Sequence, residues 1–196
     1  MVVSSGSKGD LKLLPPPQVG RWRLYERMAL QVRSFAGLGT NARLDPFDLA
    51  GFLNIRVVYL KDMVGLSDSA HACLDTVEGW SGGATPDLGD GSYVVILNDK
   101  HSLGRQKATL MEEICHILFG HKPSGLASSG LGGRSYNVSI EDEAYAVGAA
   151  ALVPYRSLKD FLMSGYSIRK IAGHFGVTPS LVIYRAKGVR LHDLLP

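Results

Sequence analysis

The sequence has few cysteines, no long apolar run and little excess charge, and each shortage excludes a class of protein. Only Cys73 and Cys115 occur among 196 residues, which argues against a disulfide scaffold and favours reduced thiols in the cytoplasm. No apolar run approaches the roughly 20 residues that span a bilayer, and polar residues interrupt the start of the chain, where a signal peptide needs an apolar core. We therefore expect neither a membrane partner nor export.

The net charge gives little indication of a partner, but the content of apolar residues indicates a folded domain. The formal net charge of +3 does not by itself favour nucleic acid. At 45% hydrophobic residues, the chain can bury the core of one domain with appendages. Residues 1–20 carry Ser-Ser-Gly-Ser and three consecutive prolines, a composition typical of a flexible tail that ends in a stiff segment. We expect this tail to precede a single domain over residues 21–196.

The hydrophobic patterns predict an α+β fold with a small, largely antiparallel sheet. β-branched runs and turn signals predict strands over 55–60, 79–84 and 92–97. Asp45 and Pro46 are typical of a helix cap and first helical position. A Gly- and Ser-rich segment, 122–137, is expected to be a mobile loop. Helices are expected over 21–35, 46–53, 108–119, 140–153, 155–165, 167–175 and 178–187.

The segment Met111–His121 is the main candidate for chemistry. On a helix, Glu112 and His116 lie one turn apart, on the side opposite an apolar stripe, with Glu113 beside them. Two ligands at this spacing reach one ion, and Glu113 is placed to hold a water on that ion. The string E-E-x-x-H has the geometry of the zincin helix H-E-x-x-H, with Glu112 at the first histidine. The alternative is a solvated helix face on which Glu112 and His116 form an ion pair.

A zincin-like core needs a third protein ligand, for which Glu143 is the candidate. Glu143 shares a helix face with the apolar Ala146, Val147 and Ala150. An unpaired carboxylate on the core side of a helix is unfavourable, so it needs a partner. A metal held against the neighbouring helix would be one partner, and Arg105 or Lys107 would be the alternative.

His121 follows the motif after Gly120. Continued helically, His121 would lie nearly opposite His116, although Gly120 allows the chain to turn elsewhere. We expect His121 to have a structural role or to support a ligand, rather than to bind the metal itself.

The spacing of residues 167–187 is that of a helix-turn-helix. On a recognition helix, Thr178, Ser180, Tyr184, Arg185 and Lys187 would contact DNA. The alternative is that this segment completes the globule. Because basic residues are not dense here, we favour the second interpretation and do not expect a DNA partner.

Together these stretches resemble the ImmA/IrrE family of bacterial and phage metallopeptidases over roughly residues 21–190. The similarity lies in residues 42–50 followed by Ile-Arg-Val-Val at 55–58, and in Val-Ile-Leu-Asn at 95–98 with Arg105. It continues in residues 112–121, which are similar to H-E-x-x-H-x-x-x-G-H, and in Glu141-Asp142-Glu143-Ala144 through Leu-Val-Pro at 152–154.

The resemblance implies a zincin-like, zinc-dependent endopeptidase of the cytoplasm that cleaves helix-turn-helix repressors of mobile elements or stress responses. Carried over by position, Glu113 is the base and Glu112, His116 and Glu143 are the metal ligands. His121 and Arg105 are candidates for supporting them. The competing class is a regulator with a decayed metal site that acts by binding a partner protein or DNA.

Glu112 changes the electrostatics that the resemblance implies. Zinc with two histidines and one glutamate leaves a net charge of +1, whereas one histidine and two glutamates leave zero. A less positive site acidifies bound water less, and two carboxylates shift the preference toward harder ions such as Mn²⁺. The sequence therefore predicts a weaker or alternative-metal site.

Overall fold

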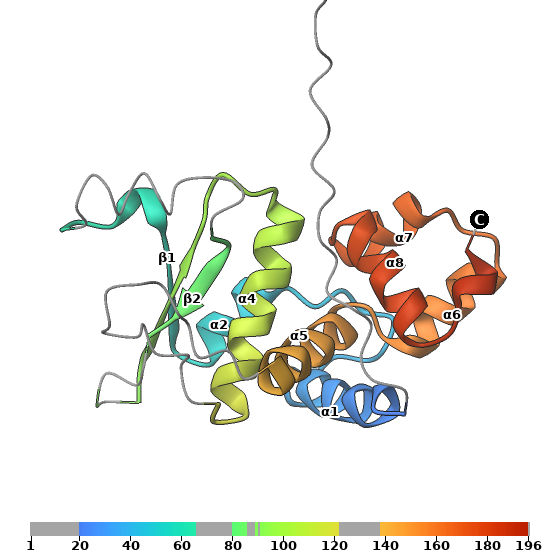
Figure 1. Ribbon diagram of the computed structural model, residues 1–196, viewed down its shortest axis with the longest axis horizontal. Coiled ribbons are helices and arrows are strands. Elements are labelled where there is room, and N and C mark those ends of the chain that lie inside the picture. Colours follow the sequence, from blue (N-terminus) through green and yellow to red (C-terminus); the bar gives the residue numbers. More distant parts are fainter. Residues whose placement is uncertain (1–19, 66–79, 86–88, 90, 122–137, 196) are drawn as a thin grey trace, which may run out of the picture.

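The computed structural model describes residues 20–65, 80–85, 89, 91–121 and 138–195, which form an α+β structure (Figure 1). The expected loop over 122–137, and the expected tail apart from Gly20, lie outside these residues. The helices and strands are α1 Trp22–Phe35, α2 Pro46–Phe52, β1 Ile55–Tyr59, β2 Gly82–Ala84, β3 Tyr93–Leu97, α4 Leu103–Leu118, α5 Val138–Leu152, α6 Tyr155–Met163, α7 Ile168–Phe175 and α8 Pro179–Gly188. Short 3₁₀ turns cover Leu60–Asp62 and His192–Leu194.

Local capping chemistry sets two of the helix starts that the sequence predicts. The Asp45 side chain accepts a hydrogen bond from the backbone N–H of Phe47 at 3.1 Å, and Pro46 is the first residue of α2. In the same way Thr178 accepts from the N–H of Leu181 at 3.2 Å before α8. These predictions are confirmed because a cap depends on residues only two or three positions apart.

Helix α4 begins five residues earlier than the apolar pattern predicts. Its first turns carry Arg105, Gln106 and Lys107, which interrupt the hydrophobic stripe. Lys107 is nevertheless 3% exposed, and its ammonium pairs with the carboxylate of Asp45. A partner that lies far away in the chain therefore stabilises helical residues that the local pattern excludes.

The sheet is mixed, so the expectation of a largely antiparallel sheet is wrong. The strand order is β1-β3-β2, with β1 parallel to β3 and β2 antiparallel to β3. A short turn is enough to join antiparallel strands, whereas parallel neighbours need a long connection. The chain between β1 and β3 is long enough for that, and β2 is left at an edge of the sheet.

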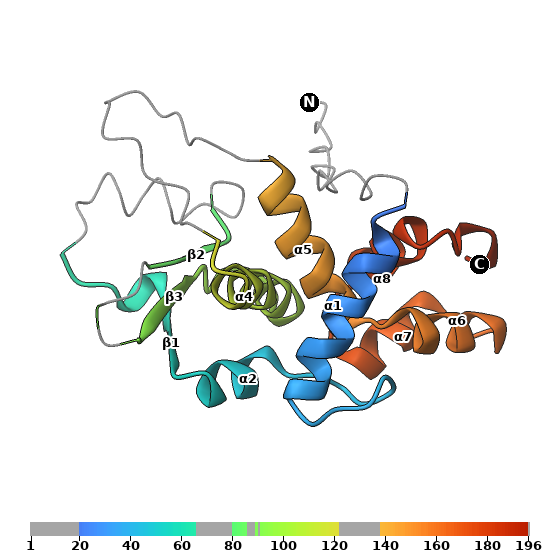
Figure 2. The same ribbon diagram turned by 90° about the horizontal axis from the view of Figure 1, so that it is seen from below.

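Helix α4 occupies the centre of the molecule, with the sheet on one side and α5 on the other (Figures 1 and 2). Its apolar face, which includes Leu110, Met111 and Ile114, is fully buried. At Gly148 the two helices approach so closely that a Cβ atom there would lie 3.3 Å from the backbone nitrogen of Glu112. This contact fixes the start of α5 beside the polar face of α4.

The C-terminal helices are joined to α1 through a buried ion pair. Arg185 on α8 donates to Glu26 on α1 at 2.6 Å, and its Nε donates to the carbonyl of Val153 at 3.0 Å. Tyr184 and Arg185, which would read DNA on a recognition helix, are only 5% and 3% exposed. Among the described helices, none has both the length and the apolar character needed to cross a bilayer.

Candidate metal centre

Three side chains from α4 and α5 converge at one point. Glu112, His116 and Glu141 each offer a ligand atom, and these atoms all lie within 4.8 Å of one another. Nε2 of His116 lies 3.4 Å from Oε2 of Glu141. All three residues are partly buried. Among the described residues, no other group of three or more His, Cys, Asp or Glu side chains is placed so that it could hold a metal ion.

The helix geometry explains why these three meet. Glu112 and His116 are four residues apart and project from the same face of α4. Glu141 lies in the first turn of α5, seven residues before Gly148, so both residues lie on the same face of that helix. Since Gly148 lies against the backbone at Glu112, the Glu141 carboxylate is carried to the same side of α4.

The structure brings Glu112 and His116 together, as the sequence predicts, but places Glu143 apart from them. The Glu143 carboxylate lies 3.3 Å from Nε2 of His121 and is not part of the three-residue cluster. Its assignment as a ligand stays a prediction. The two other suggested partners are engaged elsewhere, because Arg105 donates to Ser81 Oγ at 2.9 Å and Lys107 pairs with Asp45.

Glu141 is the member of the cluster that the sequence did not single out as a ligand. Its place in the first turn of α5 has a sufficient local explanation, since a carboxylate is favourable at a helix N-terminus. The signal that could have identified it is its distance of seven residues, or two helical turns, from Gly148. A glycine on a helix allows a neighbouring helix to approach closely, so Glu141 is on the face that packs against α4.

One carboxylate oxygen of Glu113 is bound at the edge of the sheet. Its Oε2 accepts a hydrogen bond from the backbone N–H of Ala84 at 3.1 Å. Ala84 belongs to the edge strand β2, and this N–H points away from the paired strand β3 because the neighbouring Thr85 N–H bonds to Val94. The carboxylate is thus fixed between α4 and the edge of the sheet, next to Glu112 in the chain.

His121 lies beside His116, not opposite it as a continued helix would place it. Gly120 adopts a left-handed φ of 64°, and the N–H of His121 bonds back to the carbonyl of His116 at 3.0 Å. This Schellman-type ending turns the chain over the last turn of α4. The Nδ1 atoms of the two rings lie 3.1 Å apart. Burial and the neighbouring His116 lower the pKa of His121, and Glu143 partly opposes this effect.

The electrostatics of the cluster are unbalanced toward negative charge. Burial raises the pKa of Glu112 from 4.5 to about 8, and the carboxylates of Glu113 and Glu141 add to the effect. Burial and the Glu112 carboxylate also raise the pKa of Tyr145 to about 12. Burial raises the pKa of the Cys115 thiol, which favours packing over reactivity for this residue. A cation near Glu112 would relieve the repulsion among these carboxylates.

The donor set fits a divalent ion. Imidazole nitrogen and carboxylate oxygen bind zinc at about 2.1 Å, so ligand atoms on one tetrahedral ion lie about 3.4 Å apart. The distance between His116 and Glu141 matches this value. The ligand atom of Glu112 lies within 4.8 Å of the other two, so a small movement of its side chain would bring all three to the distances of a bound ion.

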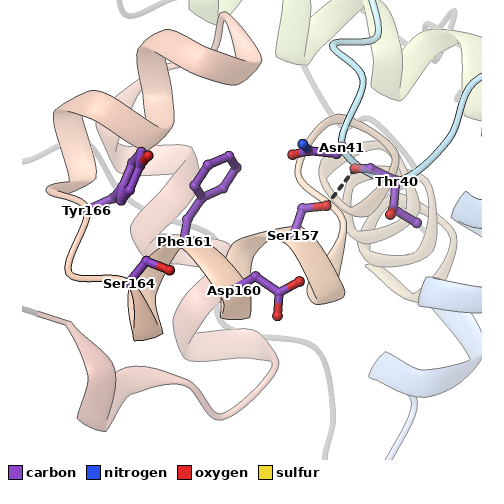
Figure 3. Close-up of a pocket in the computed structure, with 7 residues that line it drawn as sticks. All are labelled: Thr40, Asn41, Ser157, Asp160, Phe161, Ser164 and Tyr166. Atoms are coloured by element: carbon purple, nitrogen blue, oxygen red, sulfur yellow. Dashed lines mark hydrogen bonds between the residues drawn. The ribbon is translucent and has the colours of Figure 1, made fainter.

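The structure also contains an open cavity of about 270 Å³, far along the chain from this cluster. Ser157 on α6 lies in its wall and donates to the carbonyl of Thr40 at 2.8 Å (Figure 3). The cavity is lined by Thr40, Asn41, Ser157, Asp160, Phe161, Ser164 and Tyr166. None of these residues belongs to α4 or α5, so the candidate metal centre is separate from the cavity.

Comparison with known proteins agrees with the resemblance seen in the sequence. The model of the IrrE N-terminal-like domain (Peptidase_M78) matches residues 52–187. A solved structure of a Mycobacterium tuberculosis transcriptional regulator is similar over 85% of this chain, with 19% sequence identity and a TM-score of 0.48. The chain spans 46% of that regulator. No curated protein matches. Because the family model covers more than half of the chain, the chain belongs to the family of the IrrE N-terminal-like domain.

Proposed function

We propose that this chain is a metal-dependent endopeptidase whose ion is held by Glu112, His116 and Glu141, with Glu113 as the general base. The observation that carries the proposal is the convergence of the first three side chains within 4.8 Å. Family membership supports a metallopeptidase or a related regulator as the general class. We assign the third ligand to Glu141 in place of Glu143, because Glu141 is the carboxylate that lies beside His116.

A divalent ion bound there would supply a Lewis acid that polarises the peptide carbonyl and acidifies a water. Glu113 would accept the proton of the attacking water and pass it to the leaving amine. The N–H of Ala84 already orients the Glu113 carboxylate at 3.1 Å. The edge strand β2 beside Glu113 is also a place where an extended peptide could add as a further strand.

We propose zinc as the ion, with Mn²⁺ as the alternative that the ligand set favours. Two carboxylates and one imidazole neutralise the charge of a divalent ion, and oxygen-rich sites accept harder metals. The zincin-like character of the core is part of the same proposal. It is supported by the order of elements along the chain, in which the edge strand β2 precedes α4 with its E-E-x-x-H motif, and α5 with the proposed third ligand follows.

For the substrate, we propose a helix-turn-helix transcriptional repressor of a mobile element or stress response, cleaved in the cytoplasm. The proposal follows from the similarity to the ImmA/IrrE family over residues 52–187. A second candidate, a regulator without catalysis, is favoured by one observation, namely that Glu112 stands where the family motif has histidine. The burial of Tyr184 and Arg185 disfavours the form of that alternative in which α8 reads DNA.

The test uses purified full-length protein loaded with Zn²⁺ or Mn²⁺ and a repressor encoded beside its gene. We expect fragments of the repressor with the parent and none with Glu113→Gln, which should retain the metal. Asp142→Asn is the matched control, because it removes a nearby carboxylate outside the cluster and should cleave as the parent does. Equal cleavage by Glu113→Gln and the parent would overturn the mechanism.

A further inference from the structure

The end of α4 places a second imidazole and a second carboxylate directly behind His116. The ring centroids of His116 and His121 lie 5.1 Å apart, with an angle of 72° between the planes. On its far side, His121 presents Nε2 to the Glu143 carboxylate at 3.3 Å. Glu143, His121 and His116 thus form a continuous line that ends at the cluster with Glu141.

Hydrogen-bond chemistry assigns the protons along this line. A carboxylate can only accept, so Nε2 of His121 carries the hydrogen that faces Glu143. In the neutral ring, Nδ1 of His121 is then an acceptor. The Nδ1 atoms of the two rings lie 3.1 Å apart, so His116 must donate from its own Nδ1. When the His116 ring is neutral, that tautomer leaves its Nε2 without a hydrogen.

The bare nitrogen of His116 faces another acceptor. Nε2 lies 3.4 Å from Oε2 of Glu141, and two lone pairs at that distance repel unless a proton or a metal ion lies between them. This is the arrangement that a metal ligand requires, because a histidine binds a metal through its unprotonated nitrogen.

We propose that Glu143 and His121 are positioning residues that hold His116 in its metal-binding tautomer through the chain Glu143···His121···His116. The inference rests on the proposed metal centre and gives Glu143 and His121 distinct roles within it. Neither residue contacts the ion. The left-handed Gly120 makes the chain possible, since it turns His121 back over the last turn of α4.

The first test compares two replacements of His121 by their metal affinity, measured against a chelator with Zn²⁺ and Mn²⁺. Phe fills a similar volume but cannot accept a hydrogen bond, whereas the Asn amide oxygen can accept near the position of Nδ1. We expect His121→Phe to weaken binding about 10- to 100-fold and His121→Asn to restore most of it. The control is His192→Phe, which removes an exposed imidazole at the far end of the chain. A His121→Phe variant that binds like the parent, or weaker binding by Asn than by Phe, would overturn the proposal.

A second comparison separates positioning from ligation on α5. Glu143→Gln keeps an acceptor oxygen for His121, so we expect a loss of affinity below about 10-fold, whereas Glu141→Gln should lose considerably more. Asp142→Asn controls for removing one negative charge from the same turn. If Glu143→Gln lost metal binding and Glu141→Gln kept it, Glu143 would be the ligand and the positioning role would be refuted.

The third test does not depend on metal. In the metal-free parent at pH 8.5, above the ordinary titration range of histidine, ¹⁵N NMR reports which ring nitrogen carries the hydrogen. We expect the hydrogen of His116 on Nδ1, and a loss of that preference in His121→Phe. A hydrogen on Nε2 of His116, or no change in the variant, would refute the proposal. A parent that bound no metal would defeat the proposed function, while this measurement would still decide the positioning role.

Discussion

Two parts of the molecule bury acidic side chains, and they treat the charge differently. At the junction of α1 and α8, both oxygens of Glu26 are hydrogen-bonded, one by Arg185 at 2.6 Å and the other by the N–H of Tyr155 at 2.7 Å. Arg185 is hydrogen-bonded to Glu26, and the buried Arg33 also interacts electrostatically with this carboxylate. Between α4 and α5, by contrast, Glu112 and Glu141 cluster with His116, and Glu143 lies beside His121.

The difference separates a structural charge from a functional one. Removing charges from water is unfavourable in both places. At Glu26 the protein supplies the compensating charge and hydrogen bonds itself. At Glu112, burial raises the pKa of the carboxyl to about 8, and the neighbouring carboxylates of Glu113 and Glu141 add to the effect instead of opposing it. Both places bury a carboxyl, so burial together with uncompensated negative charge distinguishes the Glu112 cluster as the candidate ligand site.

The largest effect is expected from breaking the balanced pair. Arg185→Leu leaves Glu26 buried without its hydrogen-bonded cation and should lower the free energy of unfolding by about 3–5 kcal/mol. Lys187→Leu, an exposed position on the same helix, should change it by less than about 0.5 kcal/mol. Urea denaturation at pH 7 measures both. Equal effects of the two substitutions would contradict a structural role for the pair.

The unbalanced cluster should behave in the opposite way, so that removing a charge stabilises the metal-free protein. The folded state raises the pKa of Glu112 from 4.5 to about 8, so it binds more protons than the unfolded state across this range. The contribution of Glu112 to the free energy of unfolding should therefore be greatest below pH 4.5 and should fall as the pH rises to about 8.

Glu112→Gln should remove most of this decline in the free energy of unfolding. The decline amounts to a few kcal/mol, because each unit of pKa shift corresponds to about 1.4 kcal/mol. Chemical denaturation in the presence of EDTA, between pH 5 and 8.5, measures it. Parallel pH profiles of the parent and the variant would show that Glu112 is not the group responsible.

Metal should reverse the imbalance. At pH 8, an ion at 100 times its dissociation constant should stabilise the parent by about 2.7 kcal/mol. At pH 6 the gain should be smaller, because a proton must leave Glu112 before the ion binds. Glu112→His restores the histidine of the family motif and should bind Zn²⁺ about 10-fold more tightly than the parent. Thermal melts with and without Zn²⁺ test this, and a Glu112→His variant that stays unaffected by zinc would defeat it.

The smallest effect concerns the packing that brings the cluster together. Gly148→Ala places a methyl group 3.3 Å from the backbone of α4 and should destabilise the protein by about 1 kcal/mol while loosening the metal centre. Gly173→Ala on α7 meets nothing within 4 Å and should be neutral or stabilising. Melting temperatures and metal affinity of the two variants make the comparison. An unchanged metal affinity in Gly148→Ala would show that the approach of the helices is not critical.

The elements that the sequence predicted well depend on neighbours within a few residues. The caps at Asp45 and Thr178, and the pairing of Glu112 with His116 on one helix face, follow from local geometry. The strands at 55–60 and 92–97 follow from their β-branched runs, although their parallel pairing does not. Family membership followed as well, because the motif residues lie close together in the chain.

Tertiary structure alone decided which groups meet across the chain. Glu141 and Glu143 are two residues apart, and only the packing of α5 on α4 at Gly148 sets one beside His116 and the other beside His121. The buried Lys107 and Arg185 depend on Asp45 and Glu26, which lie more than 60 and 150 residues away. Local sequence fixes the direction of a side chain on its own helix. What that side chain meets is set by the free energy of packing the whole core, to which all the elements contribute together.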